Sequence, residues 1–409
     1  MIRTAVITGL GAVSAAGCGR APLADAFRTS SITLTPVDRS AGYHRLQRSR
    51  LAALVGAAEL GQWIAPLVAR RMSQSSRWAV SAARMALADA SLELDPQASN
   101  PVAVVMSTAY GAAAVTEKML RQVQDEGPEA ASPALFTESV ANAPAAQVAL
   151  AVRAVGANIT VTQRQAGPLI ALGTAAQEVI AGRAECALVG SVDELSPLIH
   201  SILDRFGALA PADANGHEAA RPFDRRRSGF LAGEGATVVV LEEATAARRR
   251  GARALAEVDF YGSAFDPQAP RTDWSRDPST LVESLSRLLE RHDAALDDFE
   301  CVVSGACGST RGDRLEALVL EGVWGERRLP PVLAPKALTG EHGGGLLAAA
   351  VLAAAGAEFG PTPGFREVDP ELGLAPFDGS NWVAPGRLLV SCLATGGAAA
   401  WAMLTRAGQ

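Results

Sequence analysis

Aromatic side chains are scarce in this sequence, with only 11 Phe, 6 Trp and 3 Tyr among 409 residues. Basic residues do not compensate for them, because the formal net charge is −6. Proteins that bind nucleic acids usually combine basic patches with aromatic side chains on which the bases stack. We therefore expect no nucleic acid partner.

Cysteine and long apolar runs are limited as well. The cysteines form no Cys-x-x-Cys pair and no recurring spacing with histidine, which argues against a zinc site and a disulfide framework. No segment approaches the roughly 20 uninterrupted apolar residues of a membrane span. The apolar run before Cys18 resembles a lipoprotein signal, but Gly9 and Gly11 interrupt it, which favours a buried strand. We predict a cytoplasmic protein without metal, cofactor or membrane segment.

Short apolar segments alternate with helical patterns along the chain, and 48% of the residues are apolar. Strands are predicted at 4–9, 101–106, 185–190 and 235–242, and again at 300–305, 388–391 and 398–404, with amphipathic helices near 74–90 and 279–291. Strands that are apolar throughout are buried on both faces, so we expect a layered α/β fold with sheets between helices. The plan repeats, which predicts two halves, 1–250 and 251–409.

Residues 158–171 form a β-branched strand, a sharp turn and an alanine-rich helix, with Gln165 at the turn. A side chain at a helix N-terminus lies near the positive end of the helix dipole, where a cysteine has a lowered pKa and attacks as a thiolate. A carboxamide has no ionisable proton and is a poor nucleophile. The segment therefore has the frame of an acyl-transfer site without its nucleophile.

Three motifs, at residues 6–14, 221–230 and 233–236, resemble those of β-ketoacyl synthases of the thiolase superfamily. The similarity runs over nearly the whole chain, and the motifs are specific when taken together. The resemblance implies a duplicated five-layered α-β-α-β-α fold. It also implies a dimer in which sheets pair across the two-fold axis.

Active members of this family use one cysteine and two histidines, and the resemblance places these at Gln165, Gly305 and Glu341. Gly305 begins a segment similar to His-Gly-Thr-Gly-Thr ending in Gly-Asp, and Glu341 follows a Lys-x-x-x-Gly pattern. A carboxylate at 341 would repel a malonyl carboxylate and could only accept hydrogen bonds. A register shift of one residue would instead bring His342 to this position, and that alternative stays open.

We accordingly expect no catalytic residue among the three positions. Other residues of the family motifs are retained, namely Lys336, Asp313 and Glu316. The C-terminal loop has lost the family's Gly-Phe-Gly-Gly pattern, since residues 393–397 are Leu-Ala-Thr-Gly-Gly and the gating phenylalanine is missing.

This combination resembles the chain length factor, the noncatalytic subunit of type II polyketide synthases. The resemblance implies two partners, a catalytic ketosynthase subunit in a heterodimer and an acyl carrier protein. Three alternatives remain. The chain could be a glutamine-type malonyl-carrier decarboxylase, although those enzymes keep both histidines. It could be a thiolase-like enzyme using Cys392 or Cys307, or a homodimeric acyl-binding scaffold.

By the same resemblance, an acyl tunnel at the dimer interface is lined by Tyr110, Ala112, Ala113, Val115 and Phe136. Aromatic-polyketide relatives tend to carry bulky residues near Ala113 and Val115, so the small side chains favour a longer or differently curved tunnel and a polyene-type product. The alanines also fit the start of an ordinary helix. Arg225, Arg226 and Arg227 form a candidate docking surface for the acidic carrier protein.

Overall fold

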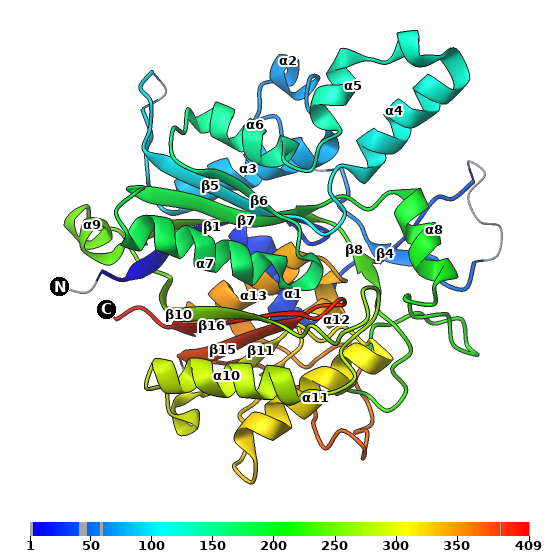
Figure 1. The fold of residues 1–409 in the computed structure, drawn as a ribbon, viewed down its shortest axis with the longest axis vertical. Helices are drawn as coiled ribbons and strands as arrows, with labels where there is room; N and C mark the ends of the chain where they lie inside the picture. Colours follow the sequence, from blue (N-terminus) through cyan, green and yellow to red (C-terminus); the bar gives the residue numbers. More distant parts are fainter. Residues whose placement is uncertain (1–2, 41–46, 58–59, 96, 385, 409) are drawn as a thin grey trace.

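The computed structural model describes residues 3–40, 47–57, 60–95, 97–384 and 386–408. Figure 1 shows two β-sheets stacked between three layers of helices. The upper layer contains α3 (Gln74–Asp89) and α6 (Ala143–Val152), the middle layer α7 (Gly167–Ile180) and α13 (Gly343–Ala354), and the lower layer α10 (Ser279–Arg291) and α11 (Thr310–Trp324). The five-layered fold expected from the family resemblance is confirmed.

The two sheets repeat one strand order. The first runs β6-β5-β7-β9-β1 and the second β12-β11-β15-β16-β10, and in each the first three strands are parallel and the last two alternate in direction. The bounds in the first sheet are Asn158–Val161, Val102–Ser107, Cys186–Asp193, Gly235–Glu243 and Ala5–Ser14. Those in the second are Val332–Leu333, Cys301–Ser304, Arg387–Leu393, Ala398–Thr405 and Ala256–Phe265.

The sheets are joined where the first residues of β1 and β10 pair in antiparallel fashion, from Ala5 to Ile7 on β1. Because two separate stretches of chain build the same topology, the fold is duplicated. The boundary predicted after residue 250 lies between α9 (Ala244–Arg249) and β10, and it stays a prediction.

The core between the sheets is exceptionally apolar. All 12 residues of α13 are buried, and they are glycine, alanine, leucine and valine only. Close packing also explains the glycines near the N-terminus. A Cβ atom at Gly9 would lie 2.2 Å from the carbonyl oxygen of Ala86, so α3 can rest directly on β1 only because position 9 lacks a side chain.

Smaller elements complete the described chain. The helices are α1 (Arg20–Thr29), α2 (Pro66–Ala69), α4 (Ala113–Glu126), α5 (Pro133–Glu138), α8 (Pro197–Arg205) and α12 (Lys336–Thr339), with 3₁₀ turns η1 (Pro128–Ala130), η2 (Arg164–Ala166) and η3 (Leu296–Asp298). The short strands are β2 (Gly17–Cys18), β3 (Thr35–Pro36), β4 (Leu51–Ala53), β8 (Ala232–Gly233), β13 (Glu358–Phe359) and β14 (Trp382–Val383).

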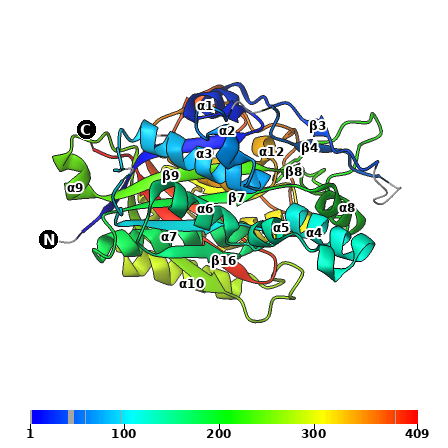
Figure 2. The same ribbon diagram turned by 90° about the horizontal axis from the view of Figure 1, so that it is seen from above.

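Helices α4 and α5 project beyond the end of α3, as the view from above shows (Figure 2). Within the ranges that the structure describes, none of the helices combines the length and the apolar character needed to span a bilayer.

Candidate functional site

Gln165 lies in η2, between the end of β6 and the first turn of α7. Pro168 fixes the start of α7, since a proline in the first turn sacrifices no helical hydrogen bond. The Gln165 side chain is partly buried, and its Oε1 has no hydrogen-bond partner among the described residues. The Cys392 thiol donates to the Gln165 carbonyl oxygen at 2.9 Å. The predicted nucleophile position thus holds an inert amide beside a thiol from β15.

Gly305 follows β11, and its environment leaves no room for a larger residue. A Cβ atom there would lie 2.8 Å from the Cys392 Sγ and 3.2 Å from the Cys392 Cα. A distance below about 3.0 Å between a carbon atom and a sulfur or carbon atom to which it is not bonded is strongly repulsive. Cys392 therefore closes the space into which a side chain at position 305 would have to grow.

Glu341 forms a buried ion pair with Lys336, whose Nζ lies 2.8 Å from Glu341 Oε1. The side chains are 0% exposed for Lys336 and 6% for Glu341. Burial opposes the charge on Lys336, but the surrounding acidic groups, Glu341 among them, raise the pKa of Lys336 above its usual value. Lys336 is therefore charged. The position of the second histidine thus holds a carboxylate that is paired with the Lys336 ammonium group and that cannot donate a hydrogen bond.

His342 is also buried, and burial followed by the charge of Lys336 lowers its pKa to about 4. The ring is therefore neutral near pH 7. It lies against glycines, since a Cβ atom at Gly233 would come within 3.0 Å of the ring and one at Gly344 within 3.1 Å. Glu341, rather than His342, makes the contact with Lys336. This observation favours the register in which Glu341 replaces the second histidine.

The two thiols near this centre are not activated. Burial raises the pKa of Cys392 to about 12, with a partly opposing effect of Lys336. Burial, followed by the charges of Glu341 and Asp313, raises the pKa of Cys307 well above its usual value. Only the thiolate is a strong nucleophile, so neither cysteine is primed for attack at neutral pH.

The retained acidic residues organise the loop after β11. Asp313 accepts hydrogen bonds from the backbone N–H groups of Phe223 at 2.9 Å, Cys307 at 3.1 Å and Gly308 at 3.1 Å. Glu316 accepts from the Ser304 hydroxyl at 3.1 Å. Burial raises the pKa of Asp313 to about 6 and that of Glu316 to about 7. These hydrogen bonds tie β11 and the loop that follows it to α11.

Asp193, at the end of β7, was not singled out from the sequence. It is buried and accepts from the Thr108 hydroxyl at 3.0 Å, from the backbone of Ala109 at 2.7 Å and, more weakly, from the backbone of Gly343 at 3.4 Å. These bonds tie the loop that carries Tyr110 to the first turn of α13. The signal in the sequence is a lone aspartate that ends an apolar strand.

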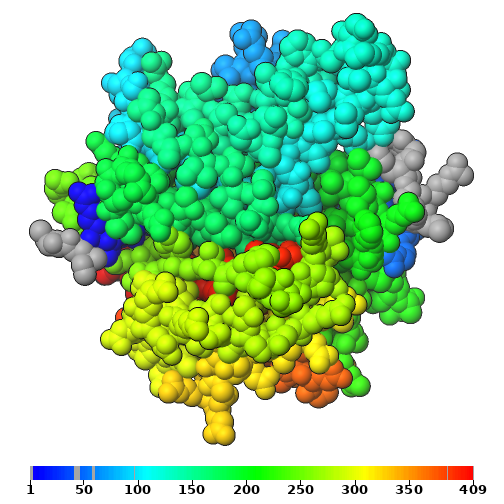
Figure 3. All heavy atoms as spheres, in the orientation of Figure 1, coloured from blue at the N-terminus to red at the C-terminus, as the bar shows by residue number. Residues whose placement is uncertain are grey.

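The residues predicted to line the tunnel do not all meet. Ala112 is buried, Tyr110, Ala113 and Val115 are partly buried, and Phe136 on α5 is 62% exposed. Val115 lines a groove of about 710 Å³ between the start of α3 and the α4–α5 hairpin, beside Arg70, Arg71 and Lys118. The same part of the chain forms the upper part of the surface in Figure 3. It exposes four further apolar side chains, those of Leu120, Val140, Leu150 and Val155.

The three arginines proposed for carrier docking form ion pairs within the chain. Arg225 contacts Glu367 at 3.0 Å, Arg226 contacts Asp224 at 3.3 Å, and Arg227 contacts Asp369. The Arg227 side chain is only 6% exposed. A docking role for this cluster stays a prediction, and only Arg225 and Arg226 are accessible enough for it.

Comparisons with known proteins agree with the fold. Residues 3–247 match the model of the β-ketoacyl synthase N-terminal domain. The tetracenomycin polyketide synthase ketoacyl synthase alpha subunit of Streptomyces glaucescens is 31% identical over 386 residues, covering 90% of this chain and 89% of the relative. The oxytetracycline polyketide putative β-ketoacyl synthase 1 of Streptomyces rimosus is 31% identical over 391 residues, covering 91% and 89%.

Two solved structures match over the full length of both chains. The ishigamide ketosynthase/chain length factor superposes with a TM-score of 0.89 at 27% identity. A type II ketosynthase in complex with its acyl carrier protein gives a TM-score of 0.88 at 22% identity, which supports the fold alone.

Proposed function

The chain belongs to the β-ketoacyl synthase family, and on that premise we propose that it is the noncatalytic chain length factor subunit of a heterodimeric type II polyketide ketosynthase. One observation carries the proposal. The three positions that react in active members hold a carboxamide at Gln165, a glycine at Gly305 packed against Cys392, and a carboxylate at Glu341 paired with Lys336.

Decarboxylative condensation requires a thiolate to hold the growing chain and hydrogen-bond donors for the charge that develops on the thioester oxygen. Gln165 cannot form the thioester, and Glu341 cannot donate. The same argument disfavours a malonyl-carrier decarboxylase, which needs the donors even without the cysteine. A thiolase-like role for Cys392 is disfavoured because burial raises the pKa of that thiol to about 12.

Overall similarity does not separate this subunit from its catalytic counterpart, because the relatives include proteins named as alpha subunits and β-ketoacyl synthases. The residues at the three positions support the assignment as the noncatalytic subunit. In the proposed complex the partner subunit supplies the cysteine and both histidines. This chain contributes part of the wall of the acyl tunnel.

Its contribution is made through the α4–α5 hairpin and β6. In the described chain β6 pairs only with β5, so its outer edge is free to pair with a strand of the partner. Phe136 and Leu120 expose apolar surface on the adjacent hairpin, at 62% and 57%. We propose that this face covers the partner's tunnel, where Ala112, Ala113 and Val115 set how far a carrier-bound polyketide extends. The small side chains favour a long, polyene-type product.

Co-expression with the candidate catalytic subunit tests the proposal. We expect the two chains to co-purify as a heterodimer and, with carrier protein and malonyl donor, to release products of defined mass. Ala113→Phe should shorten the product by at least one extender unit. Thr245→Phe, which places a phenylalanine at an exposed position of α9, should not. A stable homodimer that ignores the catalytic subunit would favour the acyl-binding scaffold instead.

A further inference from the structure

Three segments meet at the outer side of the degenerate site. They are η2, the loop at 394–397 between β15 and β16, and the loop at 266–275 after β10. The two loops are bonded to each other through their backbones, since Gly396 N–H donates to the Asp273 carbonyl oxygen and Asp266 N–H to that of Gly397, both at 2.8 Å.

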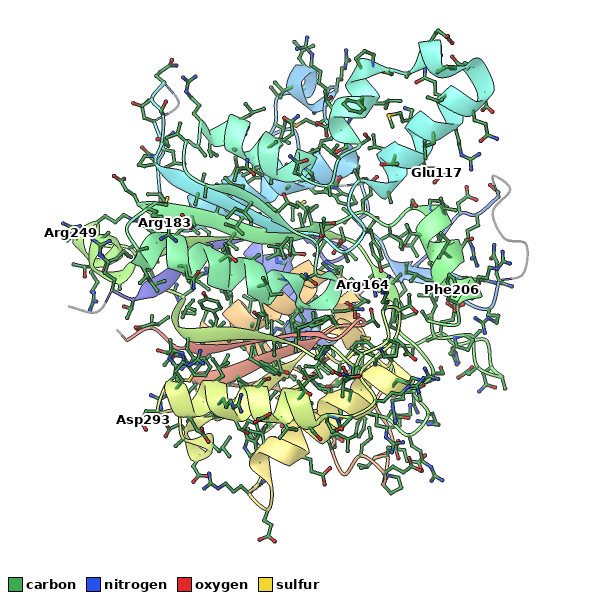
Figure 4. The ribbon with its side chains drawn as sticks, viewed as in Figure 1. Glu117, Arg164, Arg183, Phe206, Arg249 and Asp293 are labelled. Atoms are coloured by element: carbon green, nitrogen blue, oxygen red, sulfur yellow. The ribbon has the colours of Figure 1, made fainter. Side chains whose placement is uncertain are left out.

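Arg164 connects η2 to both loops. Its Nη1 donates to the Thr395 hydroxyl at 2.6 Å and makes a longer contact of 3.5 Å with the carbonyl oxygen of Arg271. Figure 4 labels Arg164 at the N-terminal end of α7. One side chain from the first half of the fold thus holds two loops of the second half. A hydrogen bond from a charged donor is stronger than one between neutral groups.

The Arg164 backbone is in the left-handed region, with φ at 46°. Residues other than glycine adopt this conformation at a cost of order 1 kcal/mol, and they keep it only when surrounding contacts impose it. Both the backbone turn of η2, in which Ala166 N–H donates to the Gln163 carbonyl oxygen at 3.1 Å, and the contacts of the guanidinium with Thr395 and Arg271 act on Arg164 here.

By the family resemblance, the Gly-Phe-Gly-Gly pattern with its gating phenylalanine falls on residues 393–397, where Thr395 precedes the two glycines. A ring can close an entrance by volume and swing away without breaking a polar bond. A threonine hydroxyl that accepts a bond from Arg164 is instead fixed to the elbow. The exchange of an aromatic ring for a hydroxyl therefore changes a movable gate into a bonded contact.

We infer that Arg164 is a latch that holds the loops at 394–397 and 266–275 against η2 and so keeps the degenerate site covered, and that it thereby excludes carrier-bound acyl chains from this subunit. The statement about acyl chains rests on the proposed function, because it assumes that such chains are delivered to the complex. The latch itself does not depend on that function. It is a property of this chain's own loops.

Cys392 provides a reporter for the latch. It precedes Thr395 by three residues, it is 0% exposed, and its thiol is bonded to the backbone next to Arg164, at Gln165. A buried thiol reacts with a small reagent only in the fraction of molecules that are locally open. The rate of Cys392 alkylation by N-ethylmaleimide, followed by peptide mass spectrometry at fixed pH, therefore measures how often the two loops separate from η2.

Two variants remove the latch from opposite ends. Arg164→Ala deletes the donor, and Thr395→Val deletes the acceptor at nearly constant volume. Arg164 is exposed, so each should accelerate the labelling of Cys392 by about three- to tenfold, the effect expected for the loss of one solvent-accessible hydrogen bond. Arg271→Ala is the matched control, because it deletes a neighbouring cation while leaving the carbonyl acceptor in place. It should leave the rate unchanged.

Peptides containing Cys301, which is 0% exposed in β11, report on the rest of the fold. An unchanged Cys392 rate in both variants overturns the latch. An equal acceleration of labelling at Cys301 also overturns it, because the whole fold would then be loosened. An equal acceleration at Cys392 in Arg271→Ala overturns it as well, because that variant leaves the bond between Arg164 and Thr395 in place. If the heterodimer fails to form in solution but Cys392 responds as expected, the proposed function fails and the latch stands.

Discussion

At the scale of single residues, the two positions at which active members carry histidines each contact a neighbouring side chain that fits the residue now present. Gly305 has Cys392 in van der Waals contact with the place of its missing side chain, and Glu341 has Lys336. Replacing Glu341 with a histidine would remove the ion pair that Lys336 makes in this chain, and loss of a buried ion-pair partner is costly. The site has been repacked as a unit, and single reversions should not restore it.

The first prediction concerns the nucleophile. Gln165→Cys should not yield a condensing subunit, because the donors at 305 and 341 are still missing, and each such donor contributes roughly 100-fold or more to rate. We expect elongation of a primer to stay at least about 100-fold below that of the catalytic subunit. Chain elongation by the purified variant, with Gln165→Ser as the control, checks this. Robust condensation by Gln165→Cys alone would refute the argument from the oxyanion donors.

The second prediction concerns the ion pair between Lys336 and Glu341. Lys336→Met leaves a buried carboxylate without its partner and should destabilise the chain by about 3–5 kcal/mol. The double variant Lys336→Met with Glu341→Leu removes both charges and should recover most of that loss. Thermal and denaturant unfolding of the two single variants and the double variant measure the coupling. Additive losses would show that the pair has no net interaction.

At the scale of elements, the sequence predicted the parts that depend on local pattern. The β-branched run before Gln165, the apolar strands and the helix at 279–291 all follow from residue periodicity. The contact of Cys392 with Gly305 and the bonds of Asp193 to residues 108, 109 and 343 join distant parts of the chain, and no periodicity encodes them. The exposure of Phe136 also depends on how the α4–α5 hairpin projects.

The third prediction belongs to that hairpin. Phe136→Asp places a charge on the face proposed to meet the catalytic subunit, where an unpaired buried charge is strongly unfavourable. We expect co-purification of the two subunits to fall by at least about tenfold. Phe206→Asp is the matched control, because Phe206 is 82% exposed but follows α8, outside the hairpin. Equal effects of the two substitutions, or none, would place the interface elsewhere.

At the scale of the whole molecule, the residues that stabilise the duplicated fold are largely different from those at the three degenerate positions. The central helices α7 and α13 and the strands around them form a core, mostly of alanine, leucine and valine, that does not need the catalytic groups. Loss of those groups therefore leaves the frame intact. The frame still presents an outer strand, β6, and an apolar hairpin, which is what a partner subunit needs.

The fourth prediction concerns the pH dependence of stability. Burial raises the pKa of Glu316 to about 7, so the folded chain retains a proton there that the unfolded chain has released. Stability from this group is present below the unfolded pKa of about 4.5 and is lost as the pH rises through about 7. The glutamine in Glu316→Gln cannot ionise. As the pH rises from 4.5 to 8, the free energy of unfolding of this variant should therefore increase relative to that of the wild type by on the order of 3 kcal/mol.

Glu321→Gln on the exposed side of the same helix is the control, and its difference from wild type should not vary with pH in this way. Unfolding midpoints across that range decide the point. A difference between Glu316→Gln and wild type that is constant with pH would mean that Glu316 is ionised in the folded chain throughout.

The most direct measurement is the release of carbon dioxide from a malonylated acyl carrier protein, made with this chain alone, with the catalytic subunit alone and with the two together. Our account predicts background release by this chain alone and rapid release and elongation by the pair. It also predicts that the activity of the pair is lost when the partner's cysteine and histidines are substituted. Decarboxylation or elongation by this chain in the absence of any partner would contradict the account.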